Sequence, residues 1–376
     1  MSGSDRLQPP DFSRDVRCVL GLPFDALTVS QAEALIRRAI AARSRCFVST
    51  PNLNFVVACL SDEQFRTSVL QSDLSLADGW PIVSIARAIG TALPQRVAGS
   101  TLFERLVESK GGPAISVYFF GGPEGAARVA CERLNSRPRG VVCAGFDMPG
   151  FGSVEEMSSA SCIDRLNSAR PDFVVVALGA RKGQAWIQRN LERIEAPVVS
   201  HLGAVVNFIA GSVSRAPRWL QKIGLEWLWR IKEEPGLWRR YAGDGRALVS
   251  VLTTRVIPLA LRQASTRWGG TSDVSYTPGT QRSTLALHGF LGRGNLQPLR
   301  AALTDHASAR LAIAIDLRAV AWLDASAIAL LSLLYGWQQK IGAGWEVLGA
   351  SRAAQLALRG ACAGYLLSPR VSRFDA

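Results

Sequence analysis

The stretch 49–102 reads STPNLNFVVACLSDEQFRTSVLQSDLSLADGWPIVSIARAIGTALPQRVAGSTL and carries three polar turns in otherwise apolar sequence. Thr50-Pro51-Asn52 follows one short apolar run and Asp78-Gly79 follows a second, while Arg96 precedes Gly99-Ser100 in the third turn. Polar groups at the ends of apolar strands are where an α/β protein places its ligand. This stretch therefore predicts an α/β fold with a ligand site at one edge of its sheet.

Outward from this stretch, short β-branched runs alternate with amphipathic segments over residues 16–202. Alternation of this kind argues for parallel strands joined by crossover helices. The run FVVVAL is apolar at every position, as a sheet covered on both faces requires. We predict a Rossmann-like, mostly parallel α/β sheet in a domain at 17–262, after a flexible tail at 1–16. The expected strands are 46–49, 74–77, 115–120, 140–144, 173–178 and 198–201, and the expected helices include 30–43 and 123–135.

The segment 216–241, APRWLQKIGLEWLWRIKEEPGLWRRY, differs because it interleaves tryptophans with arginines and lysines. Another amphipathic segment follows at 247–261. Amphipathic spacing of this kind predicts helices. We expect 216–262 to form a helical Trp/Arg-rich appendage of the first domain.

Residues 263–282 are polar and rich in Gly, Ser and Thr, which is typical of a linker. A compact unit follows at 283–376, and its pattern predicts a second, small α/β domain. Its expected strands are 283–290, 312–317 and 345–348, and its expected helices are 296–306, 328–341 and 353–360.

Charge narrows the classes of partner. The 376 residues carry a formal net charge of +13, and only five of the basic residues are lysines. This balance suits nucleotide diphosphates, nucleic acid or an acidic membrane surface, and a compositional bias towards arginine is the alternative explanation.

Cysteine and histidine usage bounds the chemistry. The seven cysteines are scattered, without a CxxC pair, so we expect buried small hydrophobes in a reducing compartment rather than a disulfide framework. The three histidines are too far apart for a metal-ligand spacing, and we expect no metal and no cofactor. The N-terminus lacks the apolar core of a signal peptide, and no run of 18 uncharged apolar residues is present. We therefore expect a cytoplasmic protein, either soluble or resting on a membrane surface.

The three turns together resemble the motifs of the WecG/TagA/CpsF glycosyltransferases (glycosyltransferase family 26), and the resemblance covers about 16–262. It implies that Asp78 is the catalytic base that accepts the proton of the acceptor hydroxyl. It also implies that Thr50 and Asn52 orient the reacting sugars and that Arg96 binds substrate phosphate. Taken alone, Asp78-Gly79 is an ordinary turn, Thr50-Pro51-Asn52 is a proline-stiffened turn, and Arg96 is a surface arginine.

The glycine-rich turn 120–125 lies between a predicted strand and a predicted helix. Backbone N–H groups at the start of a helix can bind a phosphate, and the resemblance assigns nucleotide binding to this turn. The sequence also departs from the family pattern at two places. Gly183-Gln184 stands where the family has Gln-Glu, and Asn207 stands where it has aspartate, which leaves the donor and the activity open. The substrate-binding residues that the resemblance adds are Gly121, Gly122, Gly125, Lys182 and Asn207.

The Trp/Arg segment also matches the family, as R-A-P-x-W, G-L-E-W, EP and R-R-Y. The resemblance implies that this appendage rests on the inner membrane surface and meets a polyprenyl diphosphate; tryptophans favour headgroups, and arginines bind diphosphate. The alternative is an ordinary amphipathic helix that packs its tryptophans into the core. The residues assigned to the acceptor diphosphate or the membrane are Arg215, Arg218, Trp227, Arg230, Arg239 and Arg240.

The C-terminal unit resembles a STAS domain in Ala314-Ile315-Asp316-Leu317 and in Leu323-Asp324-Ala325-Ser326-Ala327. Ser326 falls where some STAS domains carry a phosphorylatable hydroxyl, so it is a candidate phosphosite, although alanines replace two flanking motif residues. A protein-docking or scaffolding role is the alternative, with a protein partner for this domain.

The resemblance as a whole implies an inverting, metal-independent transferase that acts peripherally at the inner face of the cell membrane. It would move a hexose or N-acetylhexosamine-type sugar from a UDP-sugar to a polyprenyl-diphosphate-linked saccharide during surface polysaccharide synthesis. Two alternatives stay open. One is a non-catalytic nucleotide-sugar-binding regulator that signals through its C-terminal domain. The other is a nucleic-acid-binding protein, which only the charge favours and for which no recognition motif is present.

Overall fold

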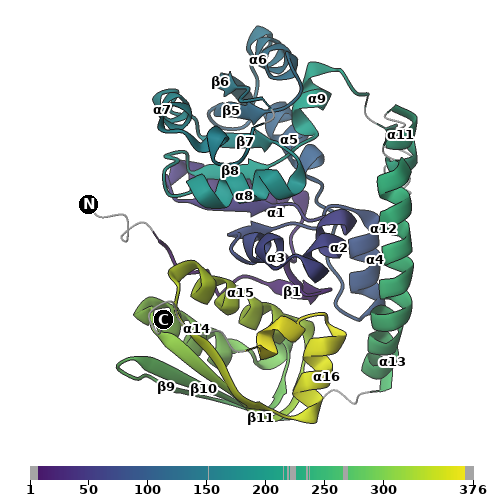
Figure 1. The fold of residues 1–376 in the computed structure, drawn as a ribbon, viewed down its shortest axis with the longest axis vertical. Helices are drawn as coiled ribbons and strands as arrows, with labels where there is room; N and C mark the ends of the chain where they lie inside the picture. The colour runs from purple at the N-terminus through teal and green to yellow at the C-terminus, as the bar shows by residue number, and fades with distance from the viewer. Residues whose placement is uncertain are drawn as a thin grey trace.

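Figure 1 shows a parallel sheet flanked by helices, a long helical rod beside it, and a second sheet at the C-terminal end. The computed structural model describes residues 7–150, 152–214, 216–217, 220, 226–233, 236, 238–265 and 270–368. The first sheet has six parallel strands in the order β4-β3-β8-β7-β5-β6, which confirms the predicted Rossmann-like α/β class. Its strands are β3 (Cys46–Ser49), β4 (Leu74–Ser75), β5 (Ile115–Gly121), β6 (Val141–Asp147), β7 (Phe173–Ala177) and β8 (Val198–His201).

Helices cover both faces of this sheet, because its central strands are apolar on both faces. Val175 packs into one buried cluster and Val174 into another on the opposite face. Local signals set several helix starts: a capping box at Thr28 begins α1, and Asn52 and Ser159 cap α2 and α7. The helices of this domain are α1 (Val29–Ala41), α2 (Leu53–Ser61), α3 (Glu63–Leu70), α4 (Trp80–Ala88), α5 (Gly99–Glu108), α6 (Ala126–Ser136), α7 (Ala160–Ser168), α8 (Ala180–Asn190) and α9 (Val205–Ala210), with a 3₁₀ turn, η2 (Glu156–Ser158).

The prediction of a flexible tail at 1–16 is wrong for the described residues 7–16. Phe12 is buried, and β1 (Val16–Val19) pairs antiparallel with β2 (Leu22–Asp25). Arg14 forms a buried ion pair with Asp25, with 2.6 Å between Nη2 and Oδ2. A charged pair held this way fixes the start of the chain against the domain.

The appendage forms a rod that runs from the first domain to the second (Figure 1). It contains α11 (Glu226–Glu233), α12 (Trp238–Val251), a π turn, η4 (Leu252–Val256), and α13 (Ile257–Ser265). Its inner side is anchored because Asp244 is buried and accepts a hydrogen bond from Asn54 Nδ2 at 3.0 Å. No helix among the described residues is both long enough and apolar enough to cross a membrane.

The C-terminal domain holds a four-stranded sheet in the order β12-β11-β10-β9. The predicted linker at 263–282 is wrong in part, because 272–277 forms an edge strand antiparallel to β10. The sequence pattern missed this strand because SDVSYT has one exposed and one half-exposed face. The elements are β9 (Ser272–Thr277), β10 (Arg282–Leu291), β11 (Ala312–Leu323), β12 (Trp345–Ala350), α14 (Gln297–Ala309), α15 (Ala325–Ile341) and α16 (Arg352–Gly360), with 3₁₀ turns η5 (Arg293–Asn295) and η6 (Gly364–Leu367).

The two domains share one hydrophobic core. Residues of β1, α2, α3 and α4 pack in the same buried cluster as β10, β11 and α15. The helix α15 lies between the second sheet and the first domain, and it is buried from residue 326 to residue 338. Lys340, near the end of α15, lies close enough to the half-buried Asp73 to oppose the rise that desolvation causes in the pKa of that carboxyl.

Gly336 tests this packing. A Cβ at this position of α15 would lie 2.7 Å from the carbonyl oxygen of Leu70, at the end of α3. We expect Gly336→Leu to lower the free energy of unfolding by about 1–3 kcal/mol, as overpacking does, measured by urea unfolding of the whole chain. Gly243→Leu, in an open part of α12, is the control and should cost nothing. An unchanged midpoint for Gly336→Leu would contradict this packing of α15 on α3.

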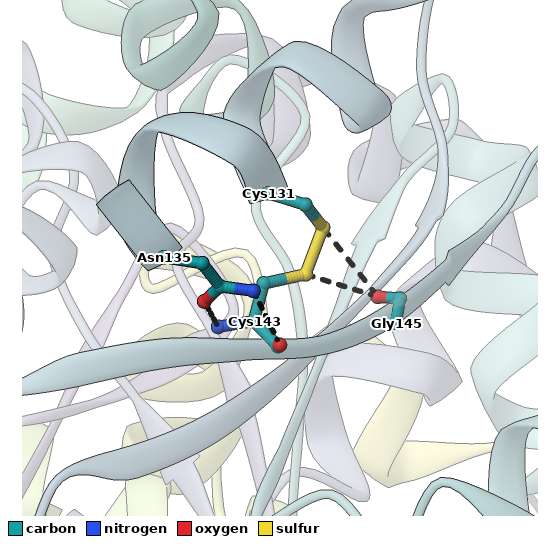
Figure 2. Close-up of a disulfide and its surroundings, with 4 residues drawn as sticks. All are labelled: Cys131, Asn135, Cys143 and Gly145. Carbon is teal, nitrogen blue, oxygen red and sulfur yellow. Dashed lines mark hydrogen bonds between the residues drawn. A yellow bond between two sulfur atoms is a disulfide. The ribbon is translucent and has the colours of Figure 1, made fainter. Parts of the chain in front are cut away.

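One cysteine pair corrects the expectation that all seven cysteines are unbonded. Cys131 on α6 and Cys143 on β6 form a disulfide, with their Cα atoms 5.0 Å apart (Figure 2). The side chain of Asn135 pairs with the backbone N–H and carbonyl of Cys143, which fixes the strand against the helix. The sequence could not predict this disulfide, because the two cysteines are twelve residues apart and come together only when α6 packs against β6. The other five cysteines are free.

Candidate active site

The carboxyl ends of β3 and β4 bring two of the predicted motifs together. The turn after β3 holds Thr50 and Asn52, and the turn after β4 holds Asp78. The backbone N–H of Asp78 donates to the carbonyl of Pro51 at 3.0 Å. Gly79 then begins α4 with φ +130°, a backbone conformation that L side chains rarely adopt.

The third motif, the turn that carries Arg96 and Gly99, lies against the turn that carries Asp78. Val97 donates its N–H to the carbonyl of Ala77 at 2.8 Å, and the N–H of Gly99, at the start of α5, donates to the Asp78 carboxylate. A side chain at Gly99 would not fit, because its Cβ would lie 2.5 Å from Leu202 and 3.2 Å from Thr50 Oγ1. The close approach of α5 therefore depends on this glycine.

The Asp78 carboxylate sits in a low-dielectric, charged environment. The pKa of Asp78 is raised to about 6, chiefly by burial; the negative charge of Glu226 contributes to this rise, and Arg96, the Gly99 N–H and Arg230 oppose it. The residue nevertheless stays partly exposed. A carboxylate with a pKa near neutral pH can take a proton at physiological pH and release it again.

Glu226 is a site residue that the sequence analysis missed. It begins α11 of the appendage, and its Oε2 accepts a hydrogen bond from Arg96 Nη1 at 3.0 Å. Both side chains are largely buried, so this ion pair ties the appendage to the turn that carries Arg96. The one sequence feature that could have pointed to Glu226 is its negative charge within the G-L-E-W run, in a segment that is mostly basic and aromatic.

Arg230 lies one helical turn after Glu226 and contributes to the field at Asp78. Its Nε is buried and has no hydrogen-bond partner among the described residues. A buried guanidinium nitrogen without a partner is costly, and an anionic ligand would satisfy it. The predicted diphosphate role of Arg230 thus has a geometric basis.

The glycine-rich turn lies at the same edge of the sheet, after β5. Gly121 has φ +88°, and its Cβ would come within 2.7 Å of Leu178, which follows β7. Gly122 faces Val206 of α9, and the next residue of that helix, Asn207, has a buried Oδ1 with no hydrogen-bond partner among the described residues. Gly125 begins α6 in the left-handed conformation with open space around it. The turn after β5 and the start of α9 thus lie next to each other beside the strand ends.

Two of the predicted substrate-binding residues, Asn52 and Lys182, already form hydrogen bonds within the protein. Asn52 Oδ1 caps α2 by accepting the N–H of Phe55 at 3.2 Å. Lys182 Nζ is exposed and donates to the carbonyl of Gly152 at 3.0 Å. The structure therefore places Asn52 beside Asp78 as a structural cap and directs Lys182 towards another loop.

The departure at 183–184 has a packing reason. A Cβ at Gly183 would collide with the ring of His201, which lies at the end of β8. The neighbouring Gln184 is fully buried, and its Nε2 donates to Ser49 Oγ at 3.0 Å, directly under the turn that carries Thr50. Gly183 and Gln184 thus support the strand ends from below.

The remaining predicted residues are only partly described. Arg215 and Arg218 lie outside the described residues, as does the side chain of Arg240. Trp227 is 42% exposed, which contradicts the alternative that this tryptophan packs into the core. Arg239 is exposed and lies over the ring of Trp238, 5.7 Å from its centroid.

Ser326 is not placed as a phosphosite would be. It is 2% exposed, and its Oγ accepts a hydrogen bond from Arg17 Nη1 at 3.1 Å. A kinase could not reach this hydroxyl in the folded chain, because the first domain covers it. In the part of the chain that the structure describes, no three His, Cys, Asp or Glu side chains are grouped to hold a metal.

The fold and the site together define a Rossmann-like α/β enzyme in which the Asp78 carboxylate and two arginines converge at the carboxyl edge of a parallel sheet. The chain belongs to the WecG/TagA/CpsF family of glycosyl transferases, whose pattern matches residues 17–260 and confirms the resemblance.

Several named relatives match much of that region. The N-acetylglucosaminyldiphosphoundecaprenol N-acetyl-beta-D-mannosaminyltransferase of Bacillus spizizenii is 26% identical over 206 residues, which are 55% of this chain and 78% of the relative. The enzyme of the same name from Staphylococcus aureus strain MW2 is 23% identical over 224 residues, 59% of this chain and 85% of the relative. The family match ends at residue 260, so the STAS resemblance of the C-terminal domain stays a prediction.

Proposed function

We propose that the protein transfers a hexose or N-acetylhexosamine-type sugar from a UDP-sugar to a polyprenyl-diphosphate-linked saccharide, with inversion, during surface polysaccharide synthesis. The observation that carries the proposal is the Asp78 carboxylate, whose pKa burial raises to about 6 while Arg96 and Arg230 lie beside it. The named activity of the relatives, which act on N-acetylglucosaminyldiphosphoundecaprenol, supports an acceptor of this class.

The chemistry assigns one task to each group. Asp78 accepts the proton of the acceptor hydroxyl as that oxygen attacks the anomeric carbon from the side opposite the leaving UDP. Arg96 and Arg230 neutralise diphosphate charge, which bidentate guanidinium groups do well. Thr50, beside Asp78, orients the sugars, and the Gly121-Gly122 turn with Asn207 holds the nucleotide.

The exposed side of the rod supports a position at the inner face of the membrane. Six of the ten large hydrophobic side chains that are exposed among the described residues lie on α11–α13. Arg239, Arg246 and Arg255 are exposed along the same rod. Apolar side chains with interspersed arginines favour the headgroup region of an anionic bilayer, where a polyprenyl diphosphate is held. The six hydrophobic residues are Trp227, Leu228, Trp238, Val249, Ile257 and Leu261.

A donor screen tests the proposal. The full-length protein is incubated with a short-chain polyprenyl-diphosphate N-acetylglucosamine and a panel of UDP-sugars, and UDP release is measured. We expect one UDP-hexose or UDP-N-acetylhexosamine to give UDP release that depends on the acceptor. Binding of a UDP-sugar without turnover on any acceptor would favour the non-catalytic regulator, which the changes at Gly183 and Asn207 also favour.

The charge of Glu226 predicts the direction in which the pH dependence of the rate shifts when that charge is removed. Because Glu226 raises the pKa of Asp78, Glu226→Gln lowers that pKa, and the active carboxylate persists to lower pH. We expect the acid limb of the rate profile to lie near pH 6 in the wild type and below it in Glu226→Gln, measured as kcat/KM against pH, which reports the pKa of the free enzyme. Glu233→Gln, at the exposed end of the same helix, is the control and should leave the limb in place. A limb that stays at its wild-type position in Glu226→Gln would contradict the assigned charge coupling.

A further inference from the structure

His201 is the last residue of β8, which lies between β3 and β7 in the first sheet. The end of β8 therefore lies between the turn that carries Thr50 and the turn that follows β7. His201 is only 9% exposed, and the sugar-transfer chemistry gives it no task. Because buried polar side chains are held by hydrogen bonds, the partners of this ring indicate what it does.

The ring holds the turn that follows β7. His201 Nε2 lies 2.6 Å from the carbonyl oxygen of Leu178, the first residue of that turn. Because a carbonyl oxygen only accepts, Nε2 is the ring nitrogen that carries the proton. Burial lowers the pKa of His201 and outweighs the opposite effect of the Leu178 carbonyl, so the ring is neutral at neutral pH. This hydrogen bond fixes the point at which the chain leaves β7 for α8.

Leu178 in turn contacts the glycine-rich turn after β5. A Cβ at Gly121 would lie 2.7 Å from the Leu178 side chain and 3.2 Å from the carbonyl oxygen of Ala177. A Cβ at Gly122 would lie 3.8 Å from the Cβ of Ala177. The strands β5 and β7 are parallel neighbours, with Gly121 in register with Ala177. In packing this close, a shift of Leu178 displaces the turn that is proposed to hold the nucleotide.

Gly183 and Phe55 fix the ring of His201 from two helices. A Cβ at Gly183 of α8 would lie 2.3 Å from His201 Cδ2 and 3.2 Å from its Nε2. The Phe55 ring of α2 lies 6.0 Å from the His201 ring, centroid to centroid. The His201 ring therefore occupies the space that a side chain at residue 183 would need, and the family pattern has glutamine there. A glutamine at 183 is long enough to place its amide where Nε2 lies, so either side chain could donate to the Leu178 carbonyl.

We propose that His201 is a positioning residue for the nucleotide donor, which holds the Leu178 turn against the Gly121 turn in place of a glutamine at residue 183. The role is positional, and no covalent step is involved. The strand β3 separates β8 from β4, which Asp78 follows, so His201 affects donor binding and leaves proton transfer to Asp78. This role rests on the proposed function, because the nucleotide is that of the UDP-sugar donor.

Variants of the full-length protein separate the hydrogen bond of the ring from its bulk. His201→Met fills the space without an N–H, and His201→Gln keeps an N–H near the position of Nε2. We expect His201→Met to raise both KM for the UDP-sugar and the calorimetric Kd for UDP by about 10-fold, with kcat within about 2-fold of the wild type. His201→Gln should return both constants to within about 3-fold of the wild type. His288→Met, at an exposed histidine of β10, is the control and should change neither constant.

A double variant tests the shared space. Gly183→Gln alone should lower the midpoint of urea unfolding, because its side chain collides with the His201 ring. Gly183→Gln with His201→Ala removes the collision and moves the N–H donor to α8. We expect this double variant to recover the midpoint and to bind UDP within about 3-fold of the wild type.

Three results would overturn the positioning role: unchanged KM and UDP affinity in His201→Met, a loss in His201→Gln as large as that in His201→Met, or a double variant that folds but binds UDP no better than His201→Met. A wild-type midpoint in Gly183→Gln would contradict the shared space. If the wild type transfers sugar and His201→Met matches it, the role of His201 fails alone. If the wild type neither binds UDP nor transfers sugar, the proposed function fails together with the donor role of His201, and the urea result still decides the contact with Gly183.

Discussion

Replacing Asp78 by asparagine is expected to lower kcat for sugar transfer by about 100- to 10,000-fold, the range that a general base contributes. The amide keeps the shape of the carboxylate and can still accept the N–H of Gly99, so the turn and donor binding should survive. What is lost is the group that takes the acceptor proton. The measurement is steady-state UDP release at saturating substrates, together with calorimetric binding of the UDP-sugar.

The matched control is Asp147→Asn. Asp147 also ends a strand of the same sheet, but it lies at the opposite edge and pairs with Arg165. This variant should turn over at close to the wild-type rate. Near-normal turnover by Asp78→Asn would remove Asp78 as the base, and loss of donor binding in that variant would point to a structural role instead.

The second large effect is expected at the exposed side of the rod. Trp238→Ser with Leu261→Ser removes two large apolar side chains, which are 55% and 67% exposed. Each contributes about 1.5–3 kcal/mol when buried in an apolar environment, so the pair should lower partitioning onto anionic vesicles by about 100-fold or more. Sedimentation with vesicles that contain phosphatidylglycerol measures the change.

Leu348→Ser with Leu356→Ser provides the control. These leucines are exposed to a similar degree but lie on β12 and α16 of the C-terminal domain. The control variant should sediment with vesicles as the wild type does. If both double variants sediment unchanged, the membrane role of the rod is wrong.

Point variants are preferred to removal of the appendage for a structural reason. A chain cut before residue 216 would lose α15 together with the rod, and α15 shares a buried cluster with Phe12, Val16 and the helices α2 to α4. The truncated protein would expose that surface to water. Its failure to bind vesicles would then reflect misfolding as readily as the loss of a membrane contact.

The parallel sheet could be predicted from the sequence because its strands are short, apolar and followed by polar turns. The expected strands at 46–49 and 198–201 match β3 and β8, since burial on both faces demands continuous apolar residues. The hairpin β1–β2 was missed because its strands are only four residues long and the second contains a proline. The edge strand β9 was missed because half-exposed strands read as polar linkers.

The sequence could predict those site residues that belong to recognisable local motifs. Thr50, Asp78 and Arg96 follow strands or precede helices in a recognisable order, and the structure brings their turns together. Glu226 was not predictable, because its role depends on α11 folding back across 130 residues onto Arg96. The burial of Ser326 by Arg17 depends in the same way on the docking of two domains.

The anomeric configuration of the product tests the central claim most directly. A single carboxylate that deprotonates the acceptor leads to one in-line displacement, so a sugar α-linked to UDP must become β-linked in the product. The coupling and carbon shifts of the new anomeric centre in the NMR spectrum of the purified product report the configuration. A β linkage is the predicted result, and an α linkage would contradict the account of Asp78 as the base of an inverting transfer.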